Sequence, residues 1–212
     1  MDIIWLGHAC FLIKGKEKTI VTDPYHPDLG YQLGAPEADI VTLSHFHPGH
    51  SYLEGVANEP KVIRSPGEYE IAGTFITGIA CFHDDRKGEL RGKNTIYSIE
   101  VDDVTLCHLG DLGHPLGPQL IEELGDIDIL LLPVGEVNAI SVDTAAEIVR
   151  QLNPAIVIPM HYKTEAVKAE LSPVDKFLEK MRAREVEAKP KLSITSSSLP
   201  GSMQIVVLDY PH

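Results

Sequence analysis

Cysteine is scarce in this chain of 212 residues, which has three cysteines and no pair at C-x-x-C spacing. This argues against a disulfide scaffold and against a cysteine-ligated zinc site, so each cysteine is expected to be a small core residue. No apolar run approaches the roughly 20 residues that span a bilayer, and the amino terminus lacks the basic and apolar regions of a signal peptide. These absences predict a protein that is not integral to a membrane, with the cytoplasm as its default location.

Positive charge is also in deficit, with 18 Lys and Arg residues against 31 Asp and Glu residues and a formal net charge of -13. The mean field of such a chain repels polyanions, so long nucleic acid is not an expected partner. The hydrophobic content of 43% and charged content of 23% are those of an ordinary globular protein. A small-molecule substrate is the expected partner, and the sequence carries no signal for an oligomeric state.

Short apolar runs rich in Ile, Val and Leu recur along the chain and end in polar residues. Runs of this length are typical of buried strands, and they predict strands at residues 2–6, 10–14, 18–22, 39–43, 74–81, 95–101, 104–109, 127–134 and 155–160. Helical patterns alternate with them at residues 51–57, 118–124, 143–152 and 173–187. Because no low-complexity linker divides the chain, we expect a single α/β domain over residues 1–212, with mixed sheets covered by helices.

Histidine is abundant, and its placement is the informative feature of the sequence. His45, His47 and His50 lie within six residues, directly after the predicted strand 39–43. Neutral imidazole is a favoured ligand of zinc and similar metals, and a turn after a rigid strand can direct several rings at one point. The alternative is a surface cluster or a set of core histidines. The spacing and the position at a strand end favour metal binding.

Further candidate ligands follow other predicted strands: His83 follows strand 74–81, Asp111 follows strand 104–109, and His161 follows strand 155–160. A single histidine after a strand is more often structural than a ligand. Together with the first cluster, however, these groups are enough for two metal ions, with Asp111 as a bridging carboxylate.

Five ordered segments and the amino-terminal strand resemble the metallo-β-lactamase superfamily. They are His45-x-His47-x-x-His50, the strand ending in Asp23, Phe82-His83-Asp84, Leu109-Gly110-Asp111, Pro159-Met160-His161-Tyr162, and Trp5-Leu6-Gly7-His8-Ala9-Cys10-Phe11. More narrowly, the chain is similar to the compact branch of predicted zinc-dependent hydrolases to which sugar-acid lactonases are related. The resemblance implies an αββα sandwich with the site at the sheet edges.

The resemblance also implies a role for each matching residue. It assigns His45, His47 and His83 to a first metal, and His50 and His161 to a second, with Asp111 as the bridge. One or two zinc ions are implied, although an imidazole-rich site also suits manganese, iron or nickel. Asp23 and Asp84 would orient ligand imidazoles or cap their loops.

One position departs from the family pattern. The motif of the family is His-x-His-x-Asp-His, in which the Asp binds the second metal, and here that position is Gly49. The three remaining ligands of the second site still equal the number in catalytic zinc sites that keep an open position. Water, or a carboxylate from another loop such as Glu136, is a candidate for the vacant place, although the favoured interpretation of Glu136 is an exposed loop residue.

The expected function is metal-dependent hydrolysis of a small molecule through a metal-bound hydroxide, on an ester, lactone, amide or phosphodiester bond. Asp111 and His8 are the catalytic candidates, since the histidine that matches His8 in this branch lies near the site and could contact substrate or shuttle a proton. Tyr162 and Lys163 are weaker candidates for binding an anionic group. The alternatives are a di-iron redox enzyme, because such relatives share the fold, and a non-catalytic metal-binding module.

Overall fold

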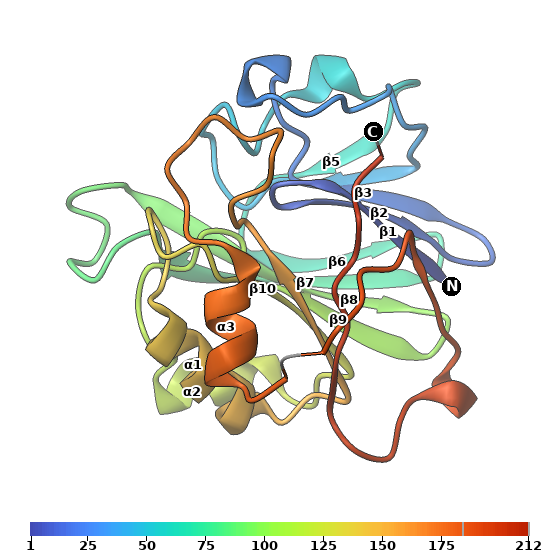
Figure 1. Cartoon of the computed structure of the whole chain (residues 1–212). Coiled ribbons are helices and arrows are strands. Elements are labelled where there is room, and N and C mark those ends of the chain that lie inside the picture. Colours follow the sequence, from blue (N-terminus) through green and yellow to red (C-terminus); the bar gives the residue numbers. More distant parts are fainter. Residues whose placement is uncertain (184, 212) are drawn as a thin grey trace.

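A computed structural model describes residues 1–183 and 185–211, and within them the chain forms two stacked β-sheets (Figure 1). The first sheet has six strands in the order β12 (Leu192–Ser193), β1 (Asp2–Gly7), β2 (Cys10–Lys14), β3 (Thr19–Thr22), β4 (Ile40–Thr42) and β5 (Lys61–Ile63). The second has seven in the order β13 (Gln204–Ile205), β11 (Ile156–Met160), β10 (Ile129–Pro133), β9 (Val104–His108), β8 (Lys93–Val101), β7 (Thr74–Phe82) and β6 (Gly67–Ile71).

The inner strands β2, β3 and β4 of the first sheet bury side chains on both of their faces. Alternate side chains point to opposite sides of a strand. On β2, Phe11 and Ile13 join the core between the sheets, whereas Cys10 and Leu12 join a second apolar cluster on the outer face. The central strands β10 and β11 are buried at every position. This explains why the strands read as continuous apolar runs in the sequence.

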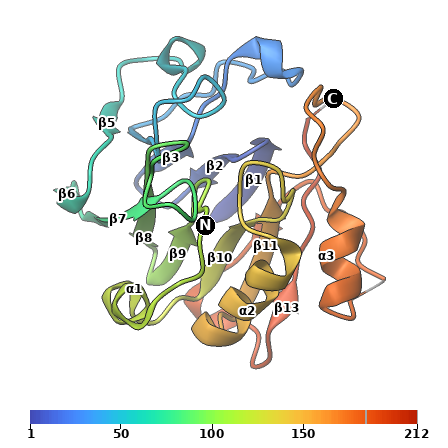
Figure 2. The same ribbon diagram turned by 90° about the vertical axis from the view of Figure 1, so that its left-hand side faces the viewer.

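The α-helices α1 (Pro118–Leu124), α2 (Val142–Leu152) and α3 (Val174–Lys180) lie on the side of the second sheet that faces away from the first (Figures 1 and 2). The outer face of the first sheet is covered by loops, from which Tyr25, Tyr31 and Val167 pack against it, and by short 3₁₀ turns at Pro27–Leu29 and Leu53–Gly55. The α/β class and the two-sheet sandwich are confirmed, with one helical layer reduced to loops and turns. No helix among the described residues has the length and apolarity needed to cross a membrane.

Strand direction brings the candidate site residues to one edge. In the first sheet, β1 and β3 run parallel because both pair antiparallel with β2, and β4 runs parallel to β3. In the second sheet, β7 and β9 both pair antiparallel with β8, while β9, β10 and β11 are mutually parallel. The segments that follow β1, β3 and β4 therefore leave the same edge of their sheet, as do those that follow β7, β9 and β11.

Two helix predictions were wrong. Residues 51–57 form only the 3₁₀ turn Leu53–Gly55, because the backbone N–H of Ala57, which would bond to Leu53 in a helix, bonds to the carbonyl of Pro36 outside the segment. The helix predicted over 173–187 ends at Lys180, since Arg182 turns into the left-handed region with φ of 59° and the N–H of Ala183 bonds back to Leu178. The short edge strands β5, β6, β12 and β13 were not predicted, because two to five residues carry too little periodicity.

Leu130 tests the packing of the central sheet. It is fully buried in β10, so Leu130→Ala is expected to lower the free energy of unfolding by about 2–5 kcal/mol in urea denaturation. Leu90 is the matched control, because 65% of its surface is exposed and Leu90→Ala is expected to change stability by less than about 0.5 kcal/mol. Equal effects of the two substitutions would contradict this account of the core.

Candidate metal centre

A cluster of histidines surrounds one carboxylate where the two sheets end. All its members except the exposed His47 are buried, with at most 6% of their surface accessible. Each follows the end of a strand or lies in the loop after β4, in agreement with the strand directions described above. The cluster consists of His8, His45, His47, His50, His83, Asp111 and His161.

His45, His47 and His83 form one group, in which one potential ligand atom from each residue lies within 4.8 Å of the other two. The ring centroids of His45 and His83 are 4.6 Å apart, and those of His47 and His83 are 5.0 Å apart. His45 and His47 come from the loop after β4, whereas His83 directly follows β7. Three imidazoles at this spacing could hold a metal ion.

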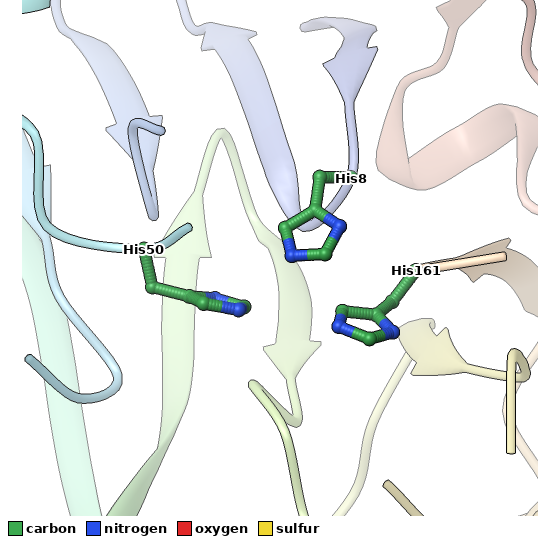
Figure 3. A group of neighbouring side chains, drawn as sticks. All are labelled: His8, His50 and His161. Carbon is green, nitrogen blue, oxygen red and sulfur yellow. The ribbon is translucent and has the colours of Figure 1, made fainter. Parts of the chain in front are cut away.

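His8, His50 and His161 form a second group with ligand atoms within the same 4.8 Å limit. Figure 3 shows the three rings converging, with His8 at the turn after β1 and His161 at the end of β11. The ring centroid of His8 lies 4.1 Å from that of His161 and 4.8 Å from that of His50. His8 was expected near the site without a place among the ligands, and the structure gives it ligand geometry.

Asp111 lies between the two groups. Its Oδ2 atom is 3.1 Å from Nε2 of His50, 3.4 Å from Nε2 of both His83 and His161, and 3.9 Å from Nε2 of His45. One carboxylate oxygen thus faces rings of both groups. This is the position that a bridging ligand would need.

Asn94 and Gly110 hold Asp111 in place. The side-chain carbonyl of Asn94 accepts the backbone N–H of Asp111 at 3.0 Å, and its amide donates to the carbonyl of Leu109 at 2.9 Å. Gly110 has φ of 57°, and a Cβ atom there would lie 2.4 Å from Oδ1 of Asn94. Only glycine fits this approach. Asn94 is a residue that the sequence analysis missed, because a polar residue within a strand carries no motif.

Asp23 and Ser44 orient two of the rings. Oδ2 of Asp23 lies 2.9 Å from Nδ1 of His50 and accepts the hydroxyl of Ser44 at 2.5 Å, while Oδ1 accepts the backbone N–H of Ser44 at 2.7 Å. The Ser44 hydroxyl also lies 2.9 Å from Nδ1 of His45. Such bonds leave Nε2 of each ring free to face a metal. The position of Asp23 matches the orienting role that the resemblance implied, and Ser44 is an addition to it.

Left-handed backbone conformations position three of these residues. The φ angles are 54° at His8, 40° at Asp23 and 53° at His161. The carbonyl of His8 accepts both the backbone N–H of His161 and the indole N–H of Trp5, each at 2.9 Å. Such conformations are costly outside glycine and cluster at functional sites.

The electrostatics of the cluster favour a positive charge at its centre. Burial, followed by the charge of His50, lowers the pKa of His45 to about 3, which keeps that ring neutral. Burial opposes the charge of His50, but Asp111 and Asp23 outweigh it and raise the pKa of His50 to about 10. Burial raises the pKa of Asp111, yet His161 and His50 more than offset this and hold it well below its usual range. Asp111 is therefore ionised. The imidazole of His45 beside it is neutral and can bind a metal.

Unpaired polar atoms give a direct test of whether these residues fit a metal. Among the described residues, six buried side-chain polar atoms have no hydrogen-bond partner, and five belong to this cluster: Nδ1 of His8, Nε2 of His45, Nδ1 of His83, Oδ1 of Asp111 and Nδ1 of His161. An unsatisfied buried polar group costs about 1–3 kcal/mol. Of the five, Nε2 of His45 and Oδ1 of Asp111 are free to bind a metal, whereas His83 and His161 face Asp111 with Nε2 and not with the unpaired Nδ1. Imidazole nitrogens and a carboxylate oxygen are the donors that zinc prefers, so the donor set fits a metal.

A cavity of about 260 Å³ opens over the cluster. Besides five of the histidines, Gly49 and Asp111, it is lined by Leu29, Arg91, Asn138, Ala169 and Leu171. The volume suits a small molecule.

Several weaker candidates have other tasks. The carboxylate of Glu136 accepts the Ser172 hydroxyl at 2.6 Å and pairs with Lys176 at 2.9 Å, so the idea that Glu136 fills the place opposite Gly49 is wrong. The ammonium group of Lys163 donates to two backbone carbonyls of its own loop, and Tyr162 packs on Trp5 with ring centroids 4.9 Å apart.

Asp84 caps its loop. Its two carboxylate oxygens accept four backbone N–H groups between residues 86 and 91. Of the two roles considered for Asp84, the structure therefore shows the capping one.

Known proteins are similar to this chain in sequence and in architecture. A family model described as the beta-lactamase superfamily domain matches residues 2–161. UPF0173 metal-dependent hydrolases of Pyrococcus horikoshii and Methanoculleus marisnigri are each 30% identical to this chain, and the alignments cover 77% and 85% of it and 85% and 89% of the relatives. A crystal structure from Thermotoga maritima, described as a Zn-dependent hydrolase of the metallo-β-lactamase superfamily, is 38% identical over 99% of both chains, with a TM-score of 0.82.

The chain therefore belongs to the metallo-β-lactamase superfamily, and the resemblance inferred from its motifs is confirmed. Since the relatives are named metal-dependent hydrolases, the expectation of an enzyme of this class is confirmed with it.

Asn94 offers a test of how the centre is held. Asn94→Ala leaves the N–H of Asp111 and the carbonyl of Leu109 without their buried partner, so it is expected to lower the free energy of unfolding by about 1–3 kcal/mol. The measurement is urea denaturation with chelator present, which separates this effect from metal binding. Gln151→Ala, on the exposed face of α2, is the control, and an Asn94 effect no larger than that of the control would contradict the role assigned here.

Proposed function

We propose that the protein hydrolyses a small molecule at a dinuclear metal centre, with zinc as the preferred ion. The observation that carries this proposal is the convergence of four imidazole Nε2 atoms on Oδ2 of the ionised Asp111 at 3.1–3.9 Å, from His45, His50, His83 and His161. Within the described residues, Nε2 of His45 and Oδ1 of Asp111 have no hydrogen-bond partner, so both are available to a bound cation.

His45, His47 and His83 would hold one ion, and His50 and His161 the other, with Asp111 between them. Divalent ions at such a centre supply Lewis acidity and a nucleophile derived from water near neutral pH. Because Asp111 is buried and ionised, its carboxylate would also stabilise positive charge close to it. Asp23 and Asn94 fix His50 and Asp111 in orientation, so little reorganisation is needed when substrate binds.

We further propose that His8 supplies the ligand that Gly49 does not. A Cβ atom built on Gly49 would lie 3.1 Å from Nε2 of His8. A larger side chain at position 49 would therefore compete with the imidazole of His8 for the same space. His8 also brings a buried ring within ligand distance of His50 and His161. In this arrangement glycine makes room for a third imidazole, and neither water nor Glu136 is required.

The reaction proposed is cleavage of an ester, lactone, amide or phosphodiester bond. The cavity of about 260 Å³ over the cluster limits the part of the substrate that reaches the centre to a small group. The exposed His47 lies at the cluster's open side.

Metal content tests the dinuclear centre. Protein purified without chelator and equilibrated with zinc is expected to hold two ions per chain by elemental analysis, and His83→Ala is expected to hold about one. His26→Ala removes a histidine from a 3₁₀-turn cap outside the cluster and is expected to keep both. Circular dichroism verifies that each variant is folded. No metal in the folded parent protein would overturn the proposal.

The exchange between positions 8 and 49 is tested by a double substitution. His8→Ala is expected to weaken binding of the second ion by 10-fold or more, with the first unaffected, because one of its imidazoles is lost. Adding Gly49→Asp to His8→Ala is expected to restore the second ion, since the space is then free for a carboxylate. Zinc competition with a chromophoric chelator and the visible spectrum of the cobalt form report both changes. Unchanged metal affinity in His8→Ala would contradict the assignment.

A further inference from the structure

A second cavity of about 470 Å³ adjoins the candidate metal centre. Its walls are the loop after β4, the end of β5, and the edge formed by β7, β8 and the loop that joins them. His47 and Arg91 line both this cavity and the one over the metal centre. A molecule held in the second cavity would therefore reach the first.

The second cavity is positively charged in a protein of net charge -13. Arg64, Arg91 and Lys93 are among its lining residues, and none of the residues that line it is Asp or Glu. A chain with 31 acidic and 18 basic residues would place carboxylates near most of its cations by chance. Three cations grouped without a carboxylate are a local reversal of the overall field, and such a reversal attracts anions.

These three cations are also available. Within residues 1–183 and 185–211, no ion pair or side-chain hydrogen bond involves the charged group of Arg64, Arg91 or Lys93, although other cations of the chain, such as Lys176 and Lys191, are paired. Arginine and lysine side chains free of intramolecular partners can donate all of their hydrogen bonds to a ligand.

The position of Arg91 is fixed by Asp84. The carboxylate of Asp84 accepts the backbone N–H of Arg91 at 2.7 Å and of Leu90 at 3.0 Å, together with those of Arg86 and Gly88 at 2.8 Å. The carboxylate oxygens of Asp84 are thereby occupied by backbone N–H groups of its own loop. Arg91 lines the metal-centre cavity together with His83 and His47, and among the described residues it forms no ion pair with a carboxylate.

We propose that this second cavity binds an anionic group of the substrate, a carboxylate or a phosphate, while the metal centre cleaves a bond nearer the histidines. The inference rests on the proposed hydrolase function and adds the substrate class: a small anionic molecule whose charge is separated from the scissile bond. Phe46, with 67% of its surface exposed at the rim, offers apolar contact to the segment in between.

A pair of metal-binding probes tests the substrate class separately from the metal centre. Acetohydroxamate binds a catalytic metal and carries no distal charge, whereas hydroxamates with a carboxylate or a phosphonate two to five carbons away carry one. Zinc-loaded protein is titrated with each probe by isothermal calorimetry. We expect at least one chain length to bind about 10-fold more tightly than acetohydroxamate, with the advantage falling as salt concentration rises.

Variants locate the effect. Arg91→Gln and the double variant Arg64→Gln with Lys93→Gln are each expected to lose most of the advantage of the charged probe. The double variant is expected to bind acetohydroxamate as the parent does, because neither residue lines the cavity over the metal centre. Arg86→Gln is the matched control, because Arg86 lies in the same loop but does not line the cavity. The carboxylate and phosphonate arms show which anion the cavity prefers.

The outcomes are distinct. Equal affinity of the parent for charged and uncharged probes would overturn the anion cavity and leave the metal centre standing, and so would an advantage that survives both sets of substitutions. Failure of acetohydroxamate to bind the zinc-loaded parent would overturn the proposed function and this inference together.

Discussion

The structure depends on how one buried negative charge is accommodated. Asp111 has almost no contact with solvent, and an isolated carboxylate in such a place would be protonated or would destabilise the fold. Four imidazoles within 3.1–3.9 Å of its Oδ2 atom prevent this. The same imidazoles, with low proton affinity at His45, are then poised as ligands. The carboxylate of Asp111 thus holds together several imidazoles whose burial without a polar partner would destabilise the fold.

Strand topology supplies the imidazoles from distant parts of the chain. Each strand that precedes a site residue points to the same edge of its sheet, and the backbone is left-handed at His8, Asp23, Gly110 and His161. Two glycines allow close contacts at the site: Gly110 permits the approach to Asn94, and Gly49 leaves room for His8. Left-handed backbone also occurs in turns away from the site, as at Arg182.

Much of this could be predicted from the sequence, because the long buried strands and the His45-x-His47-x-x-His50 spacing are strong local signals. The short edge strands were missed because they bury few side chains. Asn94 and Ser44 were missed because their roles depend on contacts with Asp111 and Asp23, far away in sequence. The contact between position 49 and His8 could not be predicted either, because His8 lies 41 residues earlier in the chain. Contacts between residues that are far apart in the sequence become visible only in the folded structure.

The two groups of imidazoles share a property that follows from their origin. His45 and His47 come from the first sheet and His83 from the second, and likewise His8 and His50 come from the first and His161 from the second. An ion in either group would therefore fasten one sheet to the other across the open end of the sandwich. Ligands that bind only the folded chain stabilise it by mass action. Separation of the two sheets would therefore be coupled to the release of such an ion.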